Sequence, residues 1–231
     1  MHFHLPKPLH GWREFVGEVG IIVIGVLIAL AAEQVVETIH WRREVATERS
    51  SLLQEARDSR DGITLRKAQQ PCIDRRLEDI HALLERHRLR QSLGVVGKIG
   101  KPAWETSSRG TWQIALTGQA LAHMPSSEKL AFSDLFGSYD DWDRESGKES
   151  DIWSRFTVLN DPDLMTDESW NNVTDAYARA VEINNLMRQL APFMLTKTVT
   201  GMPKAATPTD LSGFSQIVTQ ICKPILDPSQ A

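Results

Sequence analysis

The sequence predicts an all-α protein in which an N-terminal transmembrane helix continues into an antiparallel helical bundle. The first observation is residues 15–32 (FVGEVGIIVIGVLIALAA), which are apolar or small apart from one ionisable side chain, Glu18. The second is the rest of the chain, which is rich in Glu, Arg, Ala and Leu and spaces its apolar residues as amphipathic helices do. We therefore expect a short tail over 1–14, a transmembrane anchor over 15–36 and a helical soluble domain over 37–231.

The anchor has the length and the flanking residues of a membrane span. At about 1.5 Å per residue, a helix over 15–32 is about 27 Å long, close to the ~30 Å hydrocarbon core of a bilayer. Tryptophan and arginine favour the bilayer interfaces because each side chain has an apolar part and a polar end. Both residue types stand on either side of the anchor, which makes membrane lipid an expected partner. The predicted interface residues are Trp12, Arg13, Trp41, Arg42 and Arg43.

Two other interpretations of this segment are a buried core helix and a cleaved signal peptide. A core helix of this length without polar residues is uncommon in soluble domains. The basic start of the chain and the small-x-small pattern Ala29-Leu30-Ala31 are typical of a signal peptide. Against cleavage, Glu18 interrupts the apolar region, and helix-favouring sequence continues through 33–36. We favour a retained anchor.

One face of the anchor is suited to packing against another helix. Glu18, Gly25, Ala29 and Glu33 are separated by seven, four and four residues, so they share one side of a helix. Small residues allow a second helix to approach closely, and an intramembrane carboxyl group is costly without a partner. We predict that this face binds another transmembrane helix, from a second copy of the chain or from a different protein. The alternative places Glu18 and Glu33 at the headgroup level, where they need no partner.

The soluble part is expected to form amphipathic helices separated by breaks that contain Pro or Gly. The anchor continues as a helix to about residue 69, and Pro71 marks its end. Residues 93–102, with three glycines and one proline, are expected to form a loop. A short strand or hairpin is the alternative there, although no partner sequence is visible. Residues 196–209 are expected to form a linker. The further helices are expected over residues 73–89, 107–123, 129–142 with a continuation or restart over 152–159, and 211–225. A long helix that reaches about residue 195 is expected before the last of these, with start signals at Asp161-Pro162 and at Thr166-Asp167-Glu168.

Composition argues against one class of partner. The chain has 26 Lys and Arg against 30 Asp and Glu, a net charge of −4, and both signs are mixed along its length. Nucleic-acid binding calls for a concentrated basic surface, so nucleic acid is not an expected partner. Cys72 and Cys222 would form one disulfide in a domain outside the cytoplasm. Two buried reduced thiols are the alternative.

No residue pattern predicts a catalytic, cofactor-binding or metal site. His2, His4 and His10 lack a fourth ligand, and no nucleophile elbow, HExxH pair or phosphate loop is present in the sequence. We therefore expect no enzyme and no cofactor. An acidic cluster without the glycine and terminal glutamate of a calcium loop is expected to be a solvated helix end. Its residues are Asp140, Asp141, Asp143 and Glu145.

The tryptophans of the soluble part fall into two groups. Trp112 and Trp170 lie in amphipathic patterns and are expected in the core. Trp104 and Trp142 lie in polar surroundings, which favours contact with a partner.

Residues 10–45 (HGWREFVGEVGIIVIGVLIALAAEQVVETIHWRREV) resemble the N-terminus of a bacterial family of uncharacterised single-pass membrane proteins. Further along, the resemblance is loose and depends on Thr111-Trp112 followed by a small-residue helix to Ala122. The resemblance implies an anchored helical domain and brings no known activity.

The basic residues on the two sides of the anchor are nearly balanced, with a slight lean toward a cytoplasmic domain. An anchor at the extreme N-terminus with a large trailing domain leans the other way. We predict a bacterial inner-membrane protein with a periplasmic domain.

Three functional hypotheses remain. The first is an interaction module or accessory subunit with no catalytic activity of its own. The second is an extracytoplasmic ligand-sensing domain that relays through a membrane partner, and the third is an enzyme with an unrecognised site. A deep polar pocket would favour a sensor or an enzyme, whereas filled cores with exposed aromatic patches would favour an interaction module.

Overall fold

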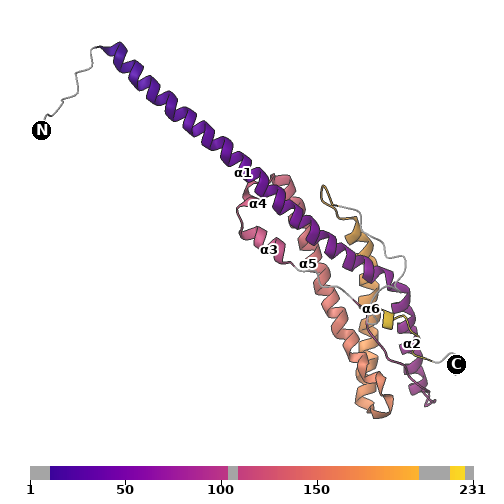
Figure 1. Cartoon of the computed structure of the whole chain (residues 1–231). Coiled ribbons are helices and arrows are strands. Elements are labelled where there is room, and N and C mark those ends of the chain that lie inside the picture. Colours follow the sequence, from indigo (N-terminus) through magenta and orange to yellow (C-terminus); the bar gives the residue numbers. More distant parts are fainter. Residues whose placement is uncertain (1–10, 104–108, 203–218, 227–231) are drawn as a thin grey trace.

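The computed structural model describes residues 11–103, 109–202 and 219–226, and within these ranges the protein is all-α, as the sequence predicts (Figure 1). The predicted tail up to residue 10 lies outside the described residues. The α-helices are α1 (Trp12–Ala68), α2 (Gln70–Arg88), α3 (Gly110–Thr117), α4 (Ala120–His123), α5 (Ser126–Ser154) and α6 (Asp167–Thr196), with the 3-10 helices η1 (Arg155–Asn160) and η2 (Pro162–Leu164) between α5 and α6.

The first helix is a long rod. With 57 residues at about 1.5 Å each, α1 is about 85 Å long. Its N-terminal part projects away from the rest of the molecule, and its C-terminal part packs on the other helices (Figure 1). The chain turns at Gln69, and Pro71 lies in the first turn of α2, where a missing N–H is tolerated.

Ion pairs fix the direction of α5 relative to α1. Arg49 pairs with Glu128, and Arg66 pairs with Glu149 further along both helices. Positions on the two helices increase together, so α1 and α5 run parallel. The segment through α3 and α4 brings the chain back to the level of Arg49 before α5 begins (Figure 1).

α6 runs antiparallel to its neighbours. His81 of α2 stacks on Tyr177, with ring centroids 5.5 Å apart, and the later His87 stacks on the earlier Trp170 at 3.9 Å. The chain also reverses through η1 and η2, so that α6 returns along α5 (Figure 1). Thr166 caps α6, accepting a hydrogen bond from the backbone N–H of Ser169 at 3.2 Å.

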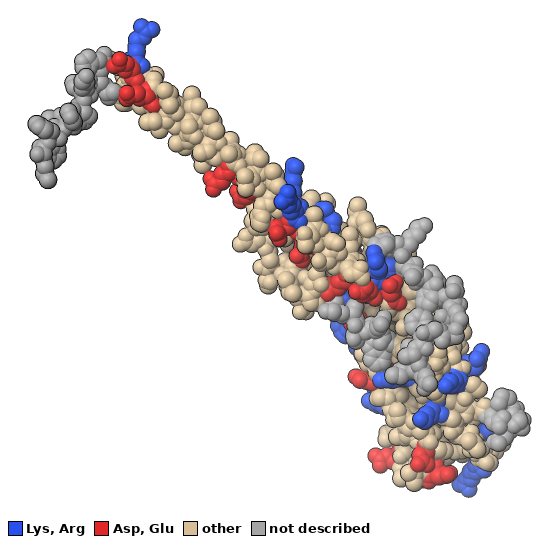
Figure 2. Space-filling model, viewed as in Figure 1, with Lys and Arg blue, Asp and Glu red and all other residues tan. Residues whose placement is uncertain are grey.

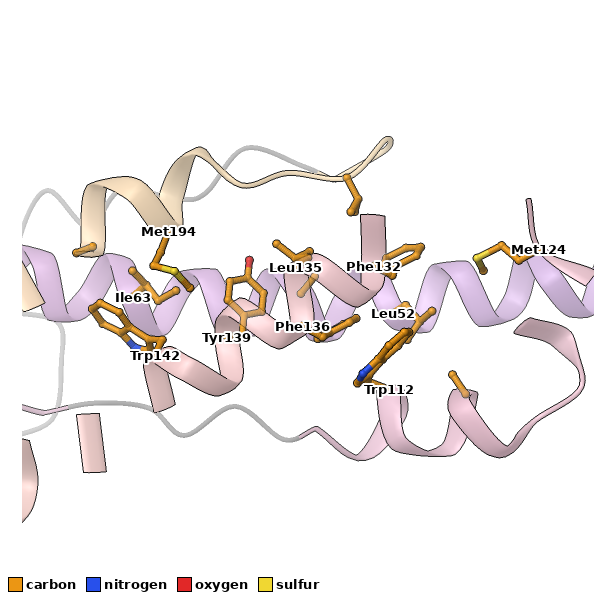
Figure 3. Packing of buried hydrophobic residues seen from close by; sticks show 14 of the residues in the cluster. Leu52, Ile63, Trp112, Met124, Phe132, Leu135, Phe136, Tyr139, Trp142 and Met194 are labelled. Carbon is orange, nitrogen blue, oxygen red and sulfur yellow. The ribbon is translucent and has the colours of Figure 1, made fainter. Parts of the chain in front are cut away.

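The bundle encloses two apolar cores. The first core is nearer the projecting end of α1 and includes Leu52, Trp112, Phe132 and Phe136 (Figure 3). The second core lies at the other end of the bundle. It includes Ile73, Ile80, Trp153, Phe156 and Trp170.

Several elements differ from the sequence expectation. α5 continues past residue 142 to Ser154, which is one of the two expected alternatives, and residues 155–160 form the 3-10 helix η1. The expected helix over 107–123 is divided into α3 and α4, and the backbone of Gly118 between them is extended. The expected terminal helix over 211–225 is wrong for its last part, since only residues 219–220 are helical and residue 226 forms a β-bridge with Val96. Residues 211–218 lie outside the described ranges.

Candidate functional site

The projecting part of α1 is the largest exposed apolar surface among the described residues. An 18-residue window of this helix has a mean hydropathy of 2.5, and none of the window is buried. Ile21, Ile24 and Ile28 expose 74, 57 and 65% of their surface. Figure 2 shows a stretch of the rod without charged atoms between its two ends. This is the one described helix whose length and composition suit a membrane span or a signal sequence.

The predicted packing face lies on this exposed segment. Glu18, Gly25, Ala29 and Glu33 are all exposed. Beyond the adjacent residues and the nearby backbone of α1 itself, no atom lies within 4 Å of a Cβ built on Gly25. The same side of the helix carries further apolar or small residues at alternating spacings of three and four, the heptad spacing of helix pairs. These residues are Ile22, Gly25, Ala29, Ala32, Val36 and Ile39, which we call the α1 seam.

The α1 seam continues beyond the expected anchor and faces away from the bundle. Val36 and Ile39 expose 67 and 46% of their surface. Val45, the first buried residue of α1, lies nearly opposite these two positions on the helical wheel. The seam is therefore open to a partner without displacement of any described helix.

The predicted interface residues differ in their surroundings. Trp12 exposes 76% of its surface, and Arg13, Arg42 and Arg43 are exposed as well. Trp41 instead stacks on His123 of α4, with ring centroids 3.9 Å apart and planes inclined by 13°. Trp41 thus marks the position where α1 enters the bundle.

A C-terminal strap, residues 219–226, is held against α2. Cys222 forms a disulfide with Cys72 across 150 residues of sequence. The backbone N–H of Gly97 donates to the carbonyl of Ile225 at 2.8 Å, next to the bridge between residues 96 and 226. The strap also contributes Ile221 and Ile225 to the second core.

Arg76 of α2 is the buried clamp of this strap. Its guanidinium is fully enclosed and donates to the carbonyl oxygens of Gln220, Ile221 and Lys223 in the strap and of Lys98 in the facing loop. Burial lowers the pKa of Arg76 to about 10, and the carboxylate of Asp79, 3.9 Å away, opposes that change. These hydrogen bonds fix the backbone of the strap and of the facing loop.

A polar layer separates the two cores. Arg66 of α1 and Glu149 of α5 form a bidentate ion pair at 2.6 and 2.9 Å, with side chains 1 and 2% exposed. Arg66 also donates to the side-chain oxygen of Asn184 in α6 at 3.2 Å. Gln70 and Asp74 extend the network along α2 through hydrogen bonds to the same asparagine. Every long helix therefore contributes to one buried, hydrogen-bonded layer.

The sequence carried a signal for this layer that the sequence reasoning missed. Arg66 continues a buried stripe of α1 whose preceding members include Ser59 and Ile63. Asn184 interrupts the buried stripe of α6 between Ala180 and Met187. A charged or amide side chain inside an apolar stripe indicates a buried partner on another helix.

The acidic cluster is not a helix end, contrary to expectation. It lies in the middle of α5, where Arg109 donates to Asp140 at 2.8 Å and to Asp143 at 2.6 Å. Burial raises the pKa of Asp143, and Arg109 counteracts that rise.

Glu55 accepts hydrogen bonds from the first backbone N–H groups of α3, which explains the helix start there.

The expectation for Trp142 is also wrong. Its side chain is 4% exposed and lies in the first core, because α5 continues past it and turns it toward α1 (Figure 3). Trp112 and Trp170 are buried, as predicted, and Trp104 lies outside the described residues.

The described residues offer grooves and no metal cluster. No three His, Cys, Asp or Glu side chains in these ranges could hold a metal ion, and His2, His4 and His10 lie outside them. Two described grooves, of about 580 and 660 Å³, lie along α1 and are lined mostly by exposed side chains. In comparisons with known proteins, no family model, curated protein or solved structure matches the chain.

Proposed function

We propose that this chain is a single-pass protein of the bacterial inner membrane whose helical domain is an interaction module or accessory subunit without catalytic activity of its own. The observation that carries the proposal is the exposure of the apolar half of α1, while both cores of the bundle are filled without it. An apolar surface of this size is stable only when lipid or another protein covers it.

The disulfide supports a domain on the periplasmic side. Disulfides persist in oxidising compartments and are rare in the cytoplasm. The strap that carries Cys222 is built around its link to Cys72, since Arg76 and the adjoining β-bridge hold the same segment.

The α1 seam supports a helix as the protein partner. Gly25, Ala29 and Ala32 permit close approach in the membrane, and Val36 and Ile39 prolong the same face toward the bundle. A second copy of the chain presents the same seam in the same membrane orientation.

The first experiment separates a retained anchor from a cleaved signal. Membranes from cells that produce the full chain are washed with alkaline carbonate, and the N-terminus of the retained protein is sequenced. We expect the chain in the membrane pellet with residues 11–31 present. A soluble product that starts after Ala31 would refute the anchor.

The second experiment addresses the partner. The full chain is crosslinked in membranes, purified in mild detergent and analysed by mass spectrometry. A dimer or a stoichiometric membrane partner that disappears when Gly25 and Ala29 are both replaced by leucine supports the interaction module. Unchanged crosslinking of that variant would exclude the seam as the contact.

A further inference from the structure

A groove of about 660 Å³ lies where α1 enters the bundle. One wall is a single face of α1, and the other wall is the end of α4 with the residue before α5. Figure 1 shows α4 as the helix of the bundle next to the projecting part of α1. The residues that carry the argument are Glu37, Trp41, Arg42 and Val45 of α1 and His123 of α4.

Contacts between the two walls hold the groove in shape. Trp41 stacks on His123 at 3.9 Å, and its ring N–H donates to a carboxylate oxygen of Glu37 at 3.2 Å. Val45 is only 8% exposed and ties this part of α1 to the first core. Glu37 is thus oriented by the indole and keeps its second oxygen for a ligand.

Glu37 and Arg42 give the groove one negative and one positive charge with which a ligand can interact. Arg49, a third charged residue of the lining, is already paired with Glu128. Arg42 is exposed on the groove side, five residues after Glu37, which is about 7.5 Å along a helix. The two residues are about 140° apart around the helix, so they lie at opposite edges of the groove with Trp41 between them. Because helical side chains lean toward the N-terminus, the long Arg42 side chain is directed back along the axis toward the level of Glu37.

The groove lies at the level of lipid headgroups if α1 is anchored as proposed above. The hydrocarbon core takes up ~30 Å of a bilayer that measures ~40–45 Å with its headgroups, so each headgroup layer is roughly 5–7 Å deep. Glu37 follows the last residue of the expected anchor, residue 36. The end of the groove at Glu37 therefore lies in the headgroup layer, and Arg42, about 7.5 Å further along the helix, lies at the outer edge of that layer.

We propose that this groove binds the zwitterionic phosphoethanolamine headgroup of a membrane lipid. Arg42 takes the phosphate by charge-assisted hydrogen bonds, and the free oxygen of Glu37 takes the ammonium group. The lipid headgroup and free phosphoethanolamine both carry a phosphate group next to a primary ammonium group, so either could bind in this way. We assign the lipid as its source because the groove adjoins the anchor.

Two other headgroups fit less well. Phosphatidylglycerol brings a negative charge and no cation, so Glu37 would repel it or remain unpaired. A choline group cannot donate hydrogen bonds to Glu37 and binds chiefly to aromatic faces, whereas one face of Trp41 is already covered by His123.

The test measures lipid retention by the full-length protein. The chain is reconstituted with equal parts of phosphatidylethanolamine and phosphatidylglycerol, transferred to a mild detergent and analysed by native mass spectrometry. We expect one retained phosphatidylethanolamine per chain. Arg42→Gln should lower its retention about tenfold, the factor that corresponds to one charge-assisted hydrogen bond. Glu37→Gln should shift retention toward phosphatidylglycerol.

The matched control is Arg43→Gln, because Arg43 is exposed on the opposite side of α1 and does not line the groove. Equal losses in the Arg42 and Arg43 variants, or no lipid preference in the unchanged chain, would overturn the proposal. If an equal concentration of soluble phosphoethanolamine displaces the lipid, the ligand of the groove is the soluble compound and not the lipid. Carbonate washing distinguishes the two failures: a chain that stays in the membrane without lipid preference refutes only the groove.

Discussion

The two halves of α1 share one continuous helix but have opposite surroundings. Apart from Glu18, residues 15–32 are apolar or small around the whole helix, and none of them is buried. Residues 45–66 bury a stripe, which includes Leu52, Ala56 and Ile63, against the other helices. Local sequence makes both halves helical, whereas the distribution of apolar residues around the helix decides what can cover each half. An apolar stripe packs on a bundle, and a helix that is apolar on all sides has the pattern of a membrane span.

The largest expected effect comes from placing charges in the apolar N-terminal half of α1. Ile24→Arg together with Ile28→Arg places two charges in the centre of the apolar segment, at a cost of about 2.5–3.5 kcal/mol each on the insertion scale. We expect the chain to leave the carbonate-washed membrane pellet, with an unchanged circular dichroism spectrum of the bundle. Ile114→Arg is the control, since Ile114 is 70% exposed but belongs to α3. Equal membrane retention of both variants would contradict the anchor.

The second largest expected effect comes from disrupting the polar layer to which the C-terminal half of α1 contributes Arg66. Arg66→Leu leaves Glu149 buried without its partner and should lower the free energy of unfolding by about 3–5 kcal/mol. The double variant Arg66→Leu, Glu149→Leu should recover most of that loss, because no buried charge remains. Chemical denaturation in mild detergent measures both. Arg144→Leu removes an exposed ion pair and should change stability by less than about 1 kcal/mol.

Removal of the disulfide should have a somewhat smaller effect. Cys222→Ser releases a link that closes 150 residues of chain and should cost about 2–4 kcal/mol. Reductant should destabilise the unchanged protein by the same amount and leave the Cys222→Ser variant unaffected. If reductant lowers both melting temperatures equally, the link does not stabilise the bundle. Thiol alkylation before and after reduction confirms the state of each sample.

The smallest effect appears only at alkaline pH and reports on the first core. Burial raises the pKa of Tyr139 from 10.0 to about 12, so the unfolded chain loses this proton first. The contribution of Tyr139 to the free energy of unfolding is fully present below pH 10.0 and is lost as the pH rises toward about 12. In Tyr177→Phe, which leaves Tyr139 as the one tyrosine, phenolate absorbance should rise near 12. A rise near 10 would show that the ring is solvated.

Much of the helical pattern could be predicted from the sequence. Pro71 and Pro125 mark helix boundaries because proline lacks the N–H that a helix interior uses, and Thr166 caps α6 as its side chain suggests. Trp142 could not be placed correctly, because its neighbours along the chain are charged while its neighbours in space are apolar. The groove at Trp41 was missed for a similar reason, since His123 lies 82 positions away.

By itself the sequence determined the all-α class, the exposed apolar segment and the ends of most long helices, because composition, periodicity and proline act within a few residues. The tertiary structure alone decided that α5 runs parallel to α1, that Arg66 meets Glu149, and that Arg76 holds the C-terminal strap. Such contacts join residues that are distant in sequence, and only the packing of whole helices brings their side chains within hydrogen-bonding distance.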